Sequence, residues 1–151
     1  MNDADRMFLT EKLVQAASLG NLVLCGELLK HGVSVDWTCD SGNAMHGIAA
    51  LHSASQNGHE EIAKLLIEHG ADVNARIIDS PSLTHKEIKV GSSPLHLAAW
   101  NGHEGICQIL IEAGAEVGAK NAVGATPEVI ASNHRRDRVA DLLAAASGST
   151  Q

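Results

Sequence analysis

Three stretches of the chain carry apolar residues at the spacing of an amphipathic helix. They are LCGELLKH (24–31), IAKLLIEH (62–69) and ICQILIEA (106–113), and a glycine follows each one. In the second stretch the apolar residues stand at i, i+3 and i+4, which places them on one face of a helix. Glycine directly after such a stripe ends a helix in the left-handed conformation without steric cost. The pattern therefore predicts helices that stop at Gly32, Gly70 and Gly114.

A shorter segment before each of these helices also carries helix signals. Ser93-Pro94 and Thr126-Pro127 predict an N-cap residue followed by proline at the first helical position. Between this first helix and the second stands another glycine, at Gly20, Gly58 and Gly102. The unit is thus a short helix, a tight turn, a second helix and an extended segment.

The unit recurs along the chain. Residues 50–75 return at 94–119 with 15 of 26 positions identical, and a chain that repeats itself in this way stacks one supersecondary unit. Pro94 and Pro127 are 33 residues apart, whereas Gly32 and Gly70 are 38 apart and Gly70 and Gly114 are 44 apart. The expected organisation is one domain, 1–151, with repeats at about 10–36, 48–74, 92–118 and 125–146 and insertions at about 37–47 and 76–91.

The third repeat, SPLHLAAWNGHEGICQILIEAGAEVGA, resembles the ankyrin-repeat consensus with its Thr-Pro-Leu-His-x-Ala signature. The resemblance covers about residues 10–145. It implies an all-α ankyrin-repeat solenoid of stacked helix-turn-helix units with β-hairpin fingers and no central sheet. The first and last repeats should be polar on their outer faces, as terminal repeats usually are. Ala49-Ala50 replaces Ser/Thr-Pro in the second repeat, so its first helix should begin less sharply.

The longer insertion has two extended-looking arms, RIID and EIKV, around a turn with Ser80-Pro81. It is expected to form an elongated hairpin beside the groove. The resemblance assigns structural roles to the positions of the repeat motif, with the histidines bonding to backbone groups of neighbouring repeats. These positions are His52, His96, Pro94, Pro127, Gly58, Gly102, Gly70 and Gly114, with His59 and His103 at the Gly-His position.

Metal, cofactor and catalytic chemistry find little support. His103 and Cys107 are four residues apart and could supply two zinc ligands, but no further pair is evident, and Ala63 stands where a zincin would need its second histidine. No nucleophile triad, phosphate loop or carboxylate pair stands out. The expected protein is not an enzyme and has no cofactor and no metal site.

The charge and composition of the chain limit which partners and which cellular compartment are expected. The formal charge of −7 argues against nucleic acid and anionic membranes, no apolar run is long enough to span a bilayer, and the start lacks a secretion signal. The basic run 134–138 is interpreted as a solvated cap in preference to a nucleic-acid site. Cys25 and Cys107 stand at a small buried position, whereas Cys39 lies in an insertion. A cytoplasmic monomer is expected, with the nucleus also open for a eukaryotic source.

Trp100 is the leading candidate for partner binding. It lies on a first helix, where ankyrin repeats face their concave groove, and its counterparts in the other repeats are polar. A large ring there is either a binding anchor or packs against the long insertion; Trp37 is either an anchor or a hairpin staple. The predicted partner-binding set is Trp100, Asn101, Gln56, Asn57, Ser18, Asn133, His134, Trp37, Arg76 and Lys86.

The resemblance implies a non-catalytic protein–protein interaction module that binds a partner protein through the concave groove and fingers. One alternative is a regulatory or inhibitory subunit or adaptor for a separate enzyme, because four repeats of this size are similar in layout to small ankyrin inhibitors of cyclin-dependent kinases or to a bacterial or phage ankyrin protein. A third is a redox- or metal-responsive protein acting through Cys39 and the histidines. Asn74 also sits where ankyrin repeats of animal cells are hydroxylated.

Overall fold

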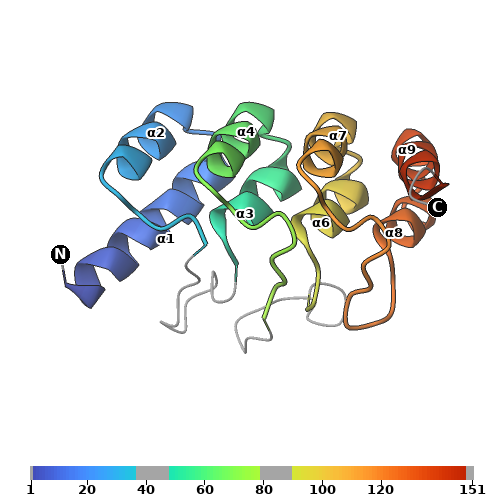
Figure 1. Ribbon diagram of the computed structural model, residues 1–151, viewed down its shortest axis with the longest axis horizontal. Coiled ribbons are helices and arrows are strands. Elements are labelled where there is room, and N and C mark those ends of the chain that lie inside the picture. Colours follow the sequence, from blue (N-terminus) through green and yellow to red (C-terminus); the bar gives the residue numbers. More distant parts are fainter. Residues whose placement is uncertain (1, 37–47, 79–89, 149–151) are drawn as a thin grey trace.

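Eight helices form four antiparallel pairs in the computed structural model, which describes residues 2–36, 48–78 and 90–148 (Figure 1). No strand occurs in these described segments. The pairs follow one another in a row, with the two termini at opposite ends. This arrangement confirms the predicted helical solenoid. The helices are α1 (Asp3–Leu19) with α2 (Leu22–Lys30), α3 (Ala50–Asn57) with α4 (Glu60–Glu68), α6 (Pro94–Asn101) with α7 (Glu104–Glu112), and α8 (Pro127–Asn133) with α9 (Asp137–Gly148).

The core is aliphatic and runs continuously through all four pairs. Each pair contributes a fully or almost fully buried leucine at the same place in its second helix, at Leu28, Leu66, Leu110 and Leu143. Alanines line the contacts between the first helices, among them Ala54, Ala98 and Ala131, and all three are completely buried. Small side chains let the first helices approach closely, and these helices pack on one another more extensively than the second helices do. The unequal packing favours a bend of the row toward the side of the first helices.

The first helices begin in the same way in three repeats. Ala49, Ser93 and Thr126 are all extended just before α3, α6 and α8, with φ between −85° and −89°. Pro94 and Pro127 are the first helical residues, as predicted. Ala49 carries no side-chain acceptor and makes no side-chain cap; its own N–H donates to His52 Nδ1 at 3.2 Å, as the Ser93 N–H does to His96.

His52 and His96 each join two parts of the backbone from a fully buried position. His96 Nδ1 accepts from the Ser93 N–H at 3.1 Å, and its Nε2 lies 3.0 Å from the Ala125 carbonyl oxygen. His52 repeats the arrangement with Nε2 2.9 Å from the Ala75 carbonyl oxygen. Because Nδ1 accepts in both rings, the proton lies on Nε2, and the neutral tautomer satisfies both backbone groups.

A second set of side chains joins consecutive repeats at the turn between the paired helices. His59 Nε2 lies 3.1 Å from the Ser18 carbonyl oxygen, and His103 Nε2 lies 3.0 Å from that of Gln56. In the last repeat Arg136 occupies the histidine position, and its Nε donates to the Trp100 carbonyl oxygen at 3.2 Å. Three successive repeats are therefore tied to the preceding one at equivalent carbonyl groups.

These ties explain why glycine stands at the turns. Gly58 has φ of 76°, and a Cβ there would lie 2.8 Å from the His103 ring. Gly102 has φ of 71° and meets the Arg136 side chain at the same distance. The left-handed backbone and the close approach of the next repeat both disfavour a side chain at these two positions.

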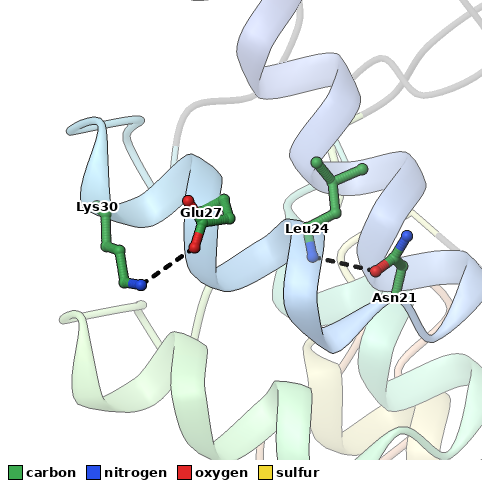
Figure 2. Close-up of polar contacts among 4 residues, drawn as sticks. All are labelled: Asn21, Leu24, Glu27 and Lys30. Carbon is green, nitrogen blue, oxygen red and sulfur yellow. Dashed lines mark hydrogen bonds and ion pairs between the residues drawn. The ribbon is translucent and has the colours of Figure 1, made fainter.

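The first repeat closes its turn in a different way. Asn21 occupies the position of His59 and His103, and its Oδ1 accepts from the Leu24 N–H at 3.0 Å, which caps α2 (Figure 2). Farther along α2, Lys30 Nζ lies 3.1 Å from Glu27 Oε1 in a solvent-exposed ion pair. Such exposed pairs contribute below about 1 kcal/mol, so the cap matters more for this helix.

The first helix pair departs from the expected polar outer face. α1 begins at Asp3, well before the predicted start of the repeat near residue 10, and it carries an exposed Phe8. Leu24 is 38% exposed, whereas its counterpart Ile62 is 2% exposed because the preceding repeat covers it. Leu19, Leu22 and Val23 are exposed as well. The last pair instead exposes the charged residues Arg135, Arg136, Asp137 and Arg138.

We predict that His96→Ala lowers the free energy of unfolding by about 1–3 kcal/mol, because it leaves the Ser93 N–H and the Ala125 carbonyl without their buried partner. Thermal or urea unfolding measures the loss. His69→Ala is the matched control: His69 is exposed, and its removal should change stability by less than about 0.5 kcal/mol. Equal losses in the two variants would contradict the assigned role of the His96 bridge.

We also predict that stability falls as the pH drops below about 6.5. Burial lowers the pKa of His52 to about 4, although its bond to the Ala75 carbonyl opposes the shift, and burial lowers the pKa of His96 as well. Between the ordinary histidine pKa of about 6.5 and the lowered value, the unfolded chain binds protons that the folded chain does not. Stability from these rings is therefore complete above about pH 6.5 and is lost as the pH falls toward 4.

Melting temperatures measured between about pH 7.5 and pH 5 test this dependence. His52→Gln should flatten the curve because glutamine does not titrate, whereas His31→Gln, at an exposed position, should leave the slope unchanged. A wild-type curve that is flat over this range would refute the prediction.

Candidate functional site

The four first helices, α1, α3, α6 and α8, lie side by side in the row, and each packs on the next (Figure 1). The last residues of these helices make up the candidate surface. We call this surface the inner face. The residue equivalent to Trp100 is half-buried in the first two repeats and exposed in the last. The inner face comprises the pairs Ser18-Leu19, Gln56-Asn57, Trp100-Asn101 and Asn133-His134.

Neighbouring repeats touch across the inner face. Asn57 Nδ2 donates to the Ser53 carbonyl at 2.9 Å and reaches Ser18 Oγ of the preceding repeat at 3.4 Å. Asn101 Nδ2 donates in the same way to the Leu97 carbonyl at 3.0 Å. The two asparagine side chains are thus held by their own helices, and the half-buried Gln56 precedes Asn57 on the same face.

Trp100 stacks on His134 of the following repeat. The ring centroids are 4.7 Å apart with an interplanar angle of 21°. Asn57 and Ser18 stand at the equivalent positions of the first two pairs and are joined by a hydrogen bond. The same two positions of neighbouring repeats therefore meet in both places, through a ring stack in one and a polar contact in the other. The Trp100 ring is half-buried, which leaves part of its surface open on the inner face.

The remaining predicted binding residues lie at other positions and make other contacts. Arg76 Nη1 donates to the Gly91 carbonyl at 3.0 Å and to the Lys120 carbonyl at 2.6 Å, so its guanidinium links the loop after α4 to the loop after α7. Asn133 is exposed at the end of α8. Trp37 and Lys86 lie outside the described residues, as do Cys39 and the tip of the long insertion.

The base of the long insertion is described and is closed by backbone pairing. The Ile77 N–H donates to the Ser92 carbonyl at 3.0 Å, and the Gly91 N–H donates to the Ile77 carbonyl at 2.8 Å. The Ile77 side chain is buried against Leu97, in a small cluster beside the main core. The two ends of the insertion are therefore anchored close to α6.

Sequence reasoning missed two kinds of contact. The basic run 134–138 is exposed, as expected for a solvated cap, but Arg136 within it also donates to the Trp100 carbonyl; the alignment of Arg136 with His59 and His103 is the sequence signal for this contact. Asp36 Oδ1 accepts from the Asp72 N–H at 2.8 Å, and Asn74 Oδ1 accepts from the Glu116 N–H at 2.8 Å, so one column of side chains joins the loops of successive repeats.

The described cysteines and histidines do not form a reactive or metal-binding cluster. Cys25 and Cys107 are free thiols with no exposed surface, and burial raises the pKa of both, that of Cys107 to about 12. In residues 2–36, 48–78 and 90–148, no three or more His, Cys, Asp or Glu side chains are grouped so that they could hold a metal ion. None of the helices described is both long enough and apolar enough to cross a bilayer.

Comparison with known proteins shows ankyrin repeats across most of this architecture. A model of ankyrin repeats in three copies matches residues 10–77, and a model of ankyrin repeats in many copies matches residues 51–111. The first covers the second half of α1, together with α2, α3 and α4, and the second adds α6 and most of α7.

The curated relatives match over a shorter stretch. The chain is 39% identical over 64 residues to potassium channel AKT3 of Oryza sativa subsp. japonica and to cortactin-binding protein 2 of Plecturocebus moloch. It is 39% identical over 61 residues to SMC5-SMC6 complex localization factor protein 1 of Bos taurus. These matches cover 40–42% of this chain but only 4–7% of the relatives, so they share the repeat and not the rest of those proteins.

The two family models together span residues 10–111, and the repeat motif and the four stacked helix pairs agree with them; the chain belongs to the ankyrin-repeat family.

Proposed function

We propose that this chain is a non-catalytic binding module that holds a partner protein on the inner face and the adjoining loops. Ankyrin repeats are generally protein–protein interaction modules, which is the family-level support. The observation that carries the proposal is the Trp100–His134 stack, a partly open aromatic platform among polar neighbours.

The surroundings of the stack suit a binding anchor. Aromatic residues that are rigidly held before binding lose little entropy when a partner covers them, and such residues dominate many interfaces. Trp100 is held from two sides, through the ring by His134 and through its carbonyl by Arg136. Gln56 and Asn101 flank it with polar groups that can orient a partner backbone by hydrogen bonds.

The rest of the described surface supports binding more than chemistry. Both described thiols are buried with raised pKa values, and the buried histidines are used on backbone carbonyl groups. The proposed setting is a reducing compartment such as the cytoplasm, in which such free cysteines persist. The proposed binding form is a monomer that presents one inner face.

We predict that Trp100→Ala weakens binding of the partner by about 2 kcal/mol or more, as expected for an aromatic anchor at an interface centre. Loss of the stack on His134 should lower stability by about 1 kcal/mol, less than the loss in His96→Ala. The partner is first recovered by affinity capture from the source cell and identified, and its affinity is then measured by calorimetric titration.

Phe8→Ala is the control, because it also removes an exposed aromatic ring but lies on the first repeat, away from Trp100. It should leave the affinity within about twofold of wild type, as most surface changes do. If Trp100→Ala keeps full affinity and lowers the melting temperature more than His96→Ala, the ring is a packing residue and the proposed binding face is wrong.

A further inference from the structure

The turns between paired helices change charge along the row. The turn of the second repeat is followed by Glu60 and Glu61, and that of the third by Glu104. In the fourth repeat the equivalent segment carries Arg135, Arg136 and Arg138. The chain has 11 Lys and Arg against 18 Asp and Glu, so these three arginines within four residues are a local exception to an acidic protein.

The arginines line a hollow next to the inner face, at the turns and the starts of the second helices of the last two pairs. It has a volume of about 430 Å³ and lies between the turn that follows α6 and the turn that follows α8. Glu104 and Asp137 also line it. Even so, in the part of the chain that the structure describes, none of the three guanidinium groups forms an ion pair. Their charges are therefore available to an outside ligand.

Arg135 stands where the other three repeats have glycine. Its φ is 56°, and it is the one non-glycine residue with positive φ in residues 2–36, 48–78 and 90–148. A side chain in this conformation strains the backbone, and glycine would relieve the strain. A strained residue held by its surroundings is consistent with a use for its side chain, and here that side chain lies at the rim of the hollow.

The site adjoins the proposed aromatic anchor. Arg136 donates through Nε to the Trp100 carbonyl, and it follows His134, whose ring stacks on Trp100, by two positions. A single extended segment that covers the Trp100–His134 stack would therefore pass next to the arginines. Planar guanidinium groups bind carboxylates through paired hydrogen bonds, which gives both attraction and orientation.

We infer that the three arginines form a docking site for an acidic segment of the partner protein, rich in Asp and Glu, which continues from the Trp100–His134 stack into the hollow. This inference rests on the proposed function, because it names the chemistry of the same partner at the end of the same face. A short acidic segment fits better than nucleic acid, since the acidic remainder of the surface repels a long polyanion.

The test uses a fluorescein-labelled octapeptide of alternating Glu and Asp, with a Gln/Asn octapeptide as the neutral probe. Anisotropy is measured at about 0.01 M ionic strength, where charge interactions reach about 30 Å, and again at about 0.15 M. The acidic peptide should bind wild type and weaken with salt, and the neutral peptide should not bind. Equal binding of both peptides would overturn the inference.

Two variants remove the charges without opening the core. Arg135→Gly relieves the backbone strain, so it should keep or raise the melting temperature while weakening the acidic peptide about tenfold. Arg138→Gln should weaken it to a similar extent. Lys30→Gln is the matched control, since it removes the same charge at the opposite end of the row, and it should change affinity by less than about twofold.

Three results would overturn the inference: unchanged peptide affinity in the double variant of Arg135 and Arg138, an equal loss in Lys30→Gln, or tighter binding of a single-stranded 20-mer DNA than of the peptide. The captured partner separates this failure from failure of the proposed function. A partner weakened by Trp100→Ala but not by the arginine variants leaves the inner face intact and removes the acidic docking site. A partner whose affinity is unchanged by Trp100→Ala refutes binding on the inner face, and with it the placement of the site in the proposed function.

Discussion

The stack depends on one recurring bond, from a side chain at the turn of each repeat to a carbonyl at the end of the preceding first helix. Helix ends leave carbonyl groups without partners inside the helix, and short helices have proportionally more of them. His59, His103 and Arg136 satisfy the carbonyls of Ser18, Gln56 and Trp100. The donor to each of these carbonyl groups comes from the next repeat. The first helices α1, α3 and α6 therefore depend on the following repeat to complete their hydrogen bonding.

This bond determines what surrounds it. The ring or guanidinium must lie against the preceding turn, which leaves no room for a Cβ at Gly58 or Gly102. It also sets the offset between neighbouring repeats, and that offset brings Asn57 to Ser18 and His134 to Trp100. The inner face is therefore ordered as a consequence of how the helix ends are satisfied. A ligand that binds there meets side chains whose positions were already determined by folding.

Much of the fold could be predicted because it depends on local signals that repeat. Gly58, Pro94 and His96 each have one physical role, and they recur at the spacing where the structure places them. The site was harder to predict because its contacts join different residue types in different repeats. The repeat alignment places Asn101 and His134 in one column, but no pattern in the sequence says that His134 stacks on Trp100. Ala49 begins α3 with the same extended backbone as Ser93 although it has no capping oxygen, and the His52 ring accepts from its N–H.

The two ends of the row show what a nearest-neighbour stack leaves undetermined. An internal repeat must fit a neighbouring repeat on both sides, so its residues at both contacts are constrained. Ile62 and Ile106 are buried for that reason. At the ends this constraint applies to one face only. The first pair has exposed apolar residues at Leu19, Leu22 and Val23. The last pair has arginines that line a hollow, and one of them, Arg136, bonds to the Trp100 carbonyl. Since Arg136 still makes the bond to the Trp100 carbonyl, the last repeat departs from the motif in chemistry while it keeps the interaction that holds it in the stack. The two ends of the row therefore carry exposed apolar and basic residues at positions where the internal repeats carry other residue types.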